Sequence, residues 1–191
     1  MTHNTSQRLF MLTFQTERLS IAPLVKEEVP WMHVLHAYPE VARYNTIGVS
    51  KGLADMEKLF RPYFEGLEKD DPRMWECTVR DGTGEIIGLV GMTLASPRYR
   101  KAEIHYNLHP KAWGKGYMSE AVLGLLDFGF GEWDLHRIEA GVHVENVRSI
   151  KLLERVGMVR EGRHREILPV RGAWADNYTY AILERDWKGQ G

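Results

Sequence analysis

Cysteine is almost absent from this sequence. Cys77 is the single cysteine among 191 residues, which excludes a disulfide within the chain and a metal site built from cysteines alone. Because Cys77 lies in the strand-like run of residues 74–79, we expect it to be a small buried apolar side chain. We expect no metal ion to take part in the function.

The sequence also lacks an excess of charge and a long apolar run. Lysine and arginine number 25 against 26 acidic residues, a net charge of -1 at pH 7, so global electrostatics favour neither a nucleic-acid nor a membrane partner. No apolar run reaches the roughly 18 residues that can cross a bilayer. The first seven residues are polar, without the apolar core of a secretion signal, and we therefore expect a cytoplasmic protein.

The composition is that of one soluble globular domain, with 43% hydrophobic and 27% charged residues and no linker, repeat or low-complexity segment. We expect residues 1–10 to form a flexible tail. Periodicity predicts strands at 18–24, 73–80, 85–94, 102–108, 137–144, 158–167 and 177–183. It predicts helices at 26–37, 51–69 (with a possible break at Pro62), 116–130 and 147–156. This order predicts an α/β (α+β) domain with a mixed sheet of about seven strands and helices on both faces.

A glycine turn between an expected strand and an expected helix is the most informative segment. Residues 107–117 end an apolar run and contain Gly114 and Gly116, directly before the helix. Glycines leave backbone N–H groups accessible, and a helix N-terminus attracts anions, so this turn predicts a pyrophosphate-binding site. The ATP-binding P-loop pattern is absent. The third glycine of the dinucleotide fingerprint is replaced by Ser119, which disfavours that alternative.

A second strand-to-helix junction follows at residues 142–151. Asn146 ends the strand and is a plausible N-cap of the next helix, or its amide binds a peptide-like ligand between two separating strands. Ser149 lies in the first helical turn and has no histidine at triad-like sequence spacing, so it is a poor nucleophile. Its hydroxyl is still able to donate a proton.

Residues 108–121 resemble the acetyl-coenzyme A-binding motif of the GNAT N-acetyltransferase superfamily. Residues 145–149 and 153–162, then 18–24 and 176–187, are similar to the branch that contains the ribosomal-protein alanine N-acetyltransferases. The resemblance covers about residues 12–187. It implies that residues 11–188 form one GNAT-type domain whose sheet is splayed at the cofactor site, with acetyl-CoA as cosubstrate.

The resemblance also implies which residues hold the cofactor. In the pattern Gln/Arg-x-x-Gly-x-Gly/Ala, the first position is Lys111 here, which is a departure from the family. The implied cofactor-binding residues are Asn107, Leu108, His109, Trp113, Gly114, Lys115, Gly116, Tyr117, Ser119 and Asn146.

The reaction implied by the family is attack of an uncharged amine on a thioester, which needs a base for the ammonium proton and an acid for the leaving thiolate. Glu103 shares a strand face with His105 and is our first choice for the base, acting directly or through water. Ser149 is the candidate acid. The alternative bases are His105, His143 with Glu139 on the next strand, and Glu166, which lies near the position of a glutamate used in the ribosomal-protein branch.

The expected acceptor is a primary amine, with a protein N-terminus as the first choice. A small-molecule amine, such as a polyamine or an aminoglycoside, is the alternative within the same reaction. A catalytically silent CoA-binding sensor is the alternative from another class. A homodimer is possible.

Overall fold

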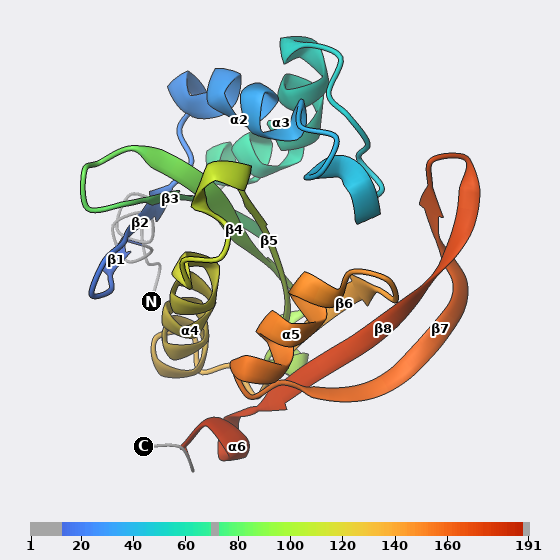
Figure 1. Ribbon diagram of the computed structural model, residues 1–191. Helices are drawn as coiled ribbons and strands as arrows, with labels where there is room; N and C mark the ends of the chain where they lie inside the picture. Colours follow the sequence, from blue (N-terminus) through green and yellow to red (C-terminus); the bar gives the residue numbers. More distant parts are fainter. Residues whose placement is uncertain (1–12, 70–72, 189–191) are drawn as a thin grey trace.

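The computed structural model describes residues 13–69 and 73–188, so the tail expected at residues 1–10 lies outside the described residues. These residues build one eight-stranded sheet in the order β1-β2-β3-β4-β5-β6-β8-β7 (Figure 1). The strands are β1 (Phe14–Gln15), β2 (Ser20–Pro23), β3 (Met74–Arg80), β4 (Ile86–Leu94), β5 (Lys101–Leu108), β6 (Arg137–His143), β7 (Val159–Val170) and β8 (Ala173–Leu183). All neighbouring pairs are antiparallel except β5 and β6, which run parallel.

The predicted mixed sheet is therefore confirmed, with one strand more than expected. The additional strand, β1, has two residues, too few to leave a period-2 pattern in the sequence. The helices are α2 (Val29–His36), α3 (Leu53–Glu68), α4 (Tyr117–Gly131), α5 (Val147–Arg155) and α6 (Glu184–Lys188), with short 3-10 helices η1 (Lys26–Glu28), η2 (Ala42–Tyr44), η3 (Pro97–Tyr99) and η4 (Pro110–Ala112).

Two local expectations change. The break considered at Pro62 does not occur, and α3 runs through this residue. Pro62 is exposed, so water can bond the carbonyl four residues earlier, which receives no hydrogen bond because proline has no N–H. The last two strands are longer than predicted and form a hairpin, which rises beside the α2 end of the molecule in Figure 1. Its two-residue turn is made by Arg171 and Gly172, both with positive φ, and Pro169 fits because β7 is the edge strand.

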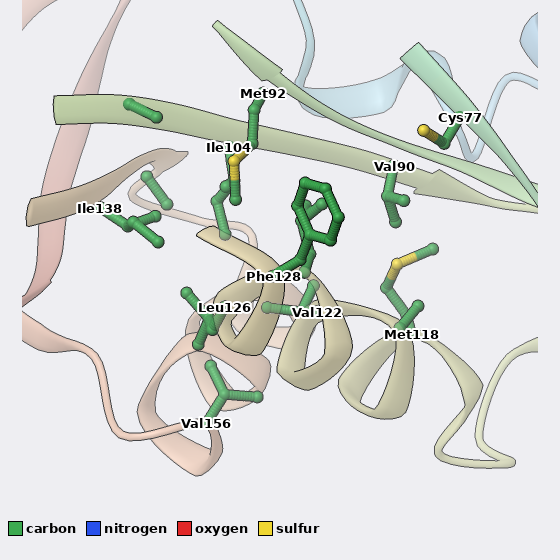
Figure 2. Close-up of a cluster of buried hydrophobic side chains, with 14 of the residues drawn as sticks. Cys77, Val90, Met92, Ile104, Met118, Val122, Leu126, Phe128, Ile138 and Val156 are labelled. Atoms are coloured by element: carbon green, nitrogen blue, oxygen red, sulfur yellow. The ribbon is translucent and has the colours of Figure 1, made fainter. Parts of the chain in front are cut away.

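Helices cover both faces of the sheet, as expected. On one face, α4 and α5 pack against the side chains of Val90, Met92, Ile104 and Ile138 (Figure 2). Close packing depends on Gly129 of α4, where a β-carbon would lie 2.8 Å from Cδ1 of Ile138. On the opposite face, α2 and α3 form a second cluster that includes the buried side chains of Leu24 and Leu89. The alternation along β4 thus assigns its residues to the two faces, with Leu89 and Gly91 toward α2 and α3.

Strands β5 and β6 separate after three residues. Their parallel pairing joins residues 101–103 to residues 137–139 and ends at the pair Glu103 and Glu139. Beyond it, β6 pairs only with β8, and β5 only with β4. Residues 104–108 of β5 and 140–143 of β6 are not paired with each other. We call this region the β5–β6 divergence. Helices α4 and α5 follow its two strands in the chain, so polar loop residues gather at the carboxyl ends of two parallel strands.

Candidate active site

The loop before α4 has the conformation expected of an anion-binding turn. Gly114 and Gly116 have φ values of 76° and 80°, in the left-handed region that favours glycine. His109 accepts a hydrogen bond from the N–H of Lys111 at its Nδ1 (3.2 Å), and the indole of Trp113 donates to the carbonyl of Leu108 (2.8 Å). These bonds hold the loop against the end of β5, and α4 starts directly after it with its N-terminus at the same place.

A salt bridge from the N-terminal region braces this loop. The guanidinium of Arg18 donates to the carbonyl of Lys115 (3.0 Å) and to the carboxylate of Glu120 (2.7 Å), and it lies over the ring of Tyr117 at 4.8 Å. Burial opposes ionisation of Glu120, but hydrogen bonds from Thr16 and Arg18 outweigh it and lower the pKa of this carboxyl. A carboxylate in the first turn of α4 also interacts favourably with the helix dipole.

The other predicted loop residues have distinct surroundings. Lys115 is exposed, and Ser119 lines a groove between α4 and the segment around β1, next to Gly116. The guanidinium of Arg148, in the first turn of α5, lies 4.4 Å from the centre of the Trp113 ring. This cation–π contact joins the loop before α4 to the first turn of α5.

Asn146 and Ser149 meet at the start of α5. The side-chain oxygen of Asn146 accepts a hydrogen bond from the N–H of Ser149 (3.3 Å), so the N-cap prediction is confirmed. This bond uses Oδ1 and leaves the amide Nδ2 without a partner within the described part of the chain. The hydroxyl of Ser149 lies 2.6 Å from that of Tyr106, on the α4–α5 face of β5. Burial raises the pKa of Tyr106 to about 12, although the bond to Ser149 acts in the opposite direction.

Glu103, His105 and Asn107 share the opposite face of β5, as predicted. This face lies toward α2 and α3, because Asn107 is paired with Leu89 of β4. Nε2 of His105 lies 3.0 and 2.9 Å from the two carboxylate oxygens of Glu76 on β3. Glu76 is buried, with 4% of its surface exposed.

Glu103 is exposed and lies beside a glycine of β6. A β-carbon on Gly141 would be 3.4 Å from Oε1 of Glu103 and 2.7 Å from Nδ2 of Asn177 on β8. The two side chains therefore approach each other over this glycine. Oδ1 of Asn177 is buried and has no hydrogen-bond partner in the described ranges.

The alternative bases are engaged elsewhere. Glu139 is paired with Lys101 and Arg137, and despite its partial burial these partners lower its pKa. The ring of His143 lies 5.0 Å from that of Tyr44, and its Nδ1 accepts the N–H of Glu145. Glu166 is exposed on the irregular part of β7, and in the described ranges no hydrogen bond joins it to β5 or β6.

Three polar residues of this region are missing from the sequence prediction: Glu76, Tyr106 and Asn177. Glu76 carries the only usable signal, a charged residue among the apolar residues Met74, Trp75 and Cys77 of the strand. Tyr106 and Asn177 resemble ordinary strand residues. In residues 13–69 and 73–188, no three His, Cys, Asp or Glu side chains gather as metal ligands would. Within the same ranges, no helix is long and apolar enough to span a bilayer.

Comparison with known proteins identifies the family. A model of the acetyltransferase (GNAT) domain matches residues 18–159. An uncharacterized N-acetyltransferase of Bacillus licheniformis is 32% identical over 179 residues, which cover 94% of this chain and 100% of that protein. The ribosomal protein uS5-alanine N-acetyltransferase of Escherichia coli is 31% identical over 104 residues, 54% of each chain.

Solved structures agree on the fold. A GNAT-family acetyltransferase from Bacillus anthracis superimposes with a TM-score of 0.77 at 29% identity, over 91% of this chain and 99% of that one. Spermidine N-acetyltransferase from Vibrio cholerae, solved in complex with CoA and spermine, gives a TM-score of 0.80 at 24% identity, with the same coverage of 91% and 99%. The family model spans most of the chain and one relative aligns along its whole length, so this chain belongs to the GNAT family of N-acetyltransferases, enzymes that transfer acetyl from acetyl-CoA to an amine.

Proposed function

We propose that the enzyme acetylates the N-terminal amine of a protein. The observation that carries this choice is the 31% identity to the ribosomal protein uS5-alanine N-acetyltransferase of Escherichia coli. The similarity to spermidine N(1)-acetyltransferase of Vibrio cholerae, 25% identical over 87% of this chain, makes a polyamine the second candidate acceptor. Both acceptors bring an ammonium group to the same reaction.

The proposed place of acetyl-CoA is the β5–β6 divergence and the loop before α4. The left-handed backbone at Gly114 and Gly116 and the N-terminus of α4 suit a pyrophosphate. The edge of β5 that faces β6 has no strand partner beyond Glu103 and suits the amide groups of the pantetheine arm, which in this proposal lies along residues 107–109. The unbonded Nδ2 of Asn146 is a donor on the other side of the divergence. In this proposal Trp113, Lys115, Tyr117 and Ser119 contact the cofactor from the loop and the first helical turn.

Glu103 and Ser149 are the proposed catalytic residues. The exposed carboxylate of Glu103 is an acceptor for an ammonium group, and it takes the first proton from this group directly or through water. The amine nitrogen then attacks the thioester carbonyl, so that the C–N bond forms and the C–S bond breaks. Ser149, whose position is fixed by the hydroxyl of Tyr106, supplies a proton to the leaving thiolate. The nitrogen loses its second proton as the amide forms, and this proton restores the Ser149 hydroxyl through solvent, so that the products are the amide and the CoA thiol.

A single acceptor panel tests the proposal. Purified enzyme is incubated with acetyl-CoA and either a peptide bearing N-terminal alanine, the same peptide with a blocked N-terminus, or spermidine. Thiol release and the mass of the product are measured. Acetylation of the free peptide and not of the blocked one supports the proposal, whereas acetylation of spermidine alone replaces it with the polyamine assignment. CoA binding without turnover of any amine would support a sensor.

Substitution then tests the two catalytic residues. Glu103→Gln is expected to lower kcat/KM for the amine and to leave the affinity for CoA unchanged, because Glu103 faces the amine. Ser149→Ala is expected to lower kcat, since only thiolate departure is affected. A wild-type pH–rate profile in Glu103→Gln would remove this residue from the proton route.

A further inference from the structure

A histidine and a buried glutamate meet across an intervening strand. Glu76 on β3, Gly91 on β4 and His105 on β5 are in register, since Glu76 pairs with Gly91 and Gly91 pairs with His105. All three positions therefore lie on the face of the sheet that is turned toward α2 and α3. Directly bonded side chains ordinarily come from adjacent strands, so this contact spans one strand more than usual.

Gly91 makes the contact possible. A β-carbon at this position would lie 2.3 Å from Nε2 of His105 and 2.6 Å from the carbonyl oxygen of Trp75. The imidazole thus lies over the backbone of β4, in the space that any other residue would fill. The sequence places the smallest residue where the ring has to pass.

Burial is unequal between the partners. The side chain of Glu76 is 5% exposed, whereas that of His105 is 39% exposed. A buried carboxylate is costly unless it is paired, and within the described residues the side chain of Glu76 is bonded by His105 alone. The carboxylate binds Nε2, which fixes the proton of a neutral imidazole on that nitrogen and leaves Nδ1 as the acceptor atom.

The charges around His105 favour its protonated form. Burial disfavours the imidazolium, but the carboxylates of Glu76 and Glu103 outweigh it and raise the pKa of His105 above its usual value. Tyr63 of α3 lies on the Glu76 side of the pair and interacts with the Glu76 carboxylate. Glu28, which also acts on Tyr63, is paired with Arg80. On β6, Glu139 is neutralised by two cations.

His105 stands at the start of the β5–β6 divergence. Glu103 is the last residue of β5 that pairs with β6, and His105 is the next residue on the same face. It therefore follows Glu103, the proposed ammonium contact, by one step along the strand. Nδ1 of His105 has no hydrogen-bond partner in the described ranges.

We infer that His105 is the catalytic residue that finally takes the proton of the acceptor amine, and that Glu76 is the positioning residue that holds its ring. The ammonium group loses one proton, directly or through a water at Glu103, to Nδ1 of His105. The neutral amine then attacks the thioester, and the imidazolium releases its proton to solvent after the acetylated product has formed. A buried carboxylate behind an imidazole performs the same orienting task in serine hydrolases.

The inference rests on the proposed transfer to an amine. Activity and pH–rate profiles together distinguish a failure of the inference from a failure of the proposed function. The variants are His105→Asn and Glu76→Gln, with His136→Asn as the matched control, because His136 is exposed and directly precedes β6, at the end of the strand away from the divergence. Each is assayed from pH 6 to 10 with acetyl-CoA and the amine that the wild type acetylates. Binding of CoA by calorimetry shows whether each variant is folded, and NMR titration of the His105 ring measures its pKa.

His105→Asn is expected to lower kcat/KM about 100-fold at neutral pH, the lower end for loss of a general base, and to abolish the acid limb of the profile. Glu76→Gln is expected to move the acid limb to lower pH, in step with the NMR titration of His105, because the charge that favours the imidazolium is gone. His136→Asn is expected to match the wild type. If His105→Asn does not fold, the position of the acid limb in Glu76→Gln tests the inference by itself.

Two results would overturn the inference. If the wild type turns over an amine and the acid limb stays in place in both variants, His105 is not the proton acceptor although the proposed function stands. If the wild type acetylates no amine at all, the proposed function fails and the inference fails with it. A limb that moves with the His105 titration is the result that a purely structural ion pair would not produce.

Discussion

The hydroxyl oxygens of Tyr106 and Ser149 lie 2.6 Å apart and join strand β5 to the first turn of α5. Either hydroxyl can donate in this bond, and the phenol stays protonated in the neutral range because its pKa is raised to about 12. The bond therefore crosses the β5–β6 divergence with a proton available on both sides. Ser149 receives its orientation from Asn146 at the backbone and from Tyr106 at the side chain.

Removal of the Tyr106 hydroxyl is expected to affect turnover and not binding. Tyr106→Phe should lower kcat by about 2- to 10-fold, the value of one neutral hydrogen bond, and leave the KM for acetyl-CoA unchanged. If the hydroxyl acts through Ser149, it has no further effect once Ser149 is alanine. Steady-state kinetics of the two single variants and the double variant measure this coupling. Equal losses from Tyr106→Phe in the presence and absence of the serine would contradict it.

The glycine loop predicts a specific loss of affinity for CoA. Gly114→Ala places a β-carbon on a backbone with φ of 76°, which costs roughly 1–2 kcal/mol and obstructs the approach of a phosphate. We expect about tenfold weaker binding of CoA, measured by calorimetry. The matched control is Gly131→Ala at the end of α4, where a β-carbon meets no atom within 4 Å and φ is not positive. Equal affinity in both variants would exclude the loop from the phosphate site.

Arg18 is expected to act on the same site from a distance. Its guanidinium holds the carbonyl of Lys115 and the carboxylate of Glu120, but its side chain is 45% exposed, so solvent screens much of this energy. Arg18→Met should therefore weaken CoA binding only about 2- to 5-fold, with little change in Tm. Arg18→Lys keeps the charge and loses the planar guanidinium that donates to two acceptors at once, and we expect it to behave like Arg18→Met. Wild-type affinity in both variants would limit Arg18 to surface pairing.

Sequence reasoning reached the succession of elements along the chain, apart from the two-residue β1 and the short α6, and the two strand-to-helix junctions, because those features are local. The turn at Gly114 and Gly116 and the cap at Asn146 are set by residues a few positions apart, and the structure has both. The His105–Glu76 contact is of another kind. It joins residues 29 positions apart and depends on a glycine in the strand between them, which only the sheet register reveals.

The last strands show the same limit. Residues 168–176 contain Pro169 and Gly172, which in the sequence indicate an irregular connection. In the structure they continue a hairpin, since an edge strand tolerates a proline and a two-residue turn accepts Arg171 and Gly172 with positive φ. The edge position is a property of the whole sheet and cannot be derived from this segment alone.

A buried histidine away from the site predicts loss of stability in acid. The side chain of His36, at the end of α2, is 1% exposed, and neither ring nitrogen has a hydrogen-bond partner in residues 13–69 and 73–188. Burial lowers its pKa from 6.5 to about 4. Between these two values the unfolded chain binds the proton and the folded chain does not, so the contribution of His36 to stability is complete above pH 6.5 and falls as the pH is lowered toward 4.

The expected size of this loss is about 1.4 kcal/mol per pH unit at most, or about 3 kcal/mol in all by pH 4. His36→Leu removes the ionisable group from the apolar interior, and its free energy of unfolding in urea should fall less steeply with acid than that of the wild type. His105, whose pKa is raised, changes the free energy of unfolding with pH in the opposite direction. The test is therefore the difference between the curves of wild type and His36→Leu, in which the effect of His105 cancels. The exposed control His136→Asn should follow the wild-type curve. Parallel curves for His36→Leu and wild type from pH 7 to 4.5 would show that His36 has the same pKa in the folded and the unfolded chain, and would contradict its burial as a neutral ring.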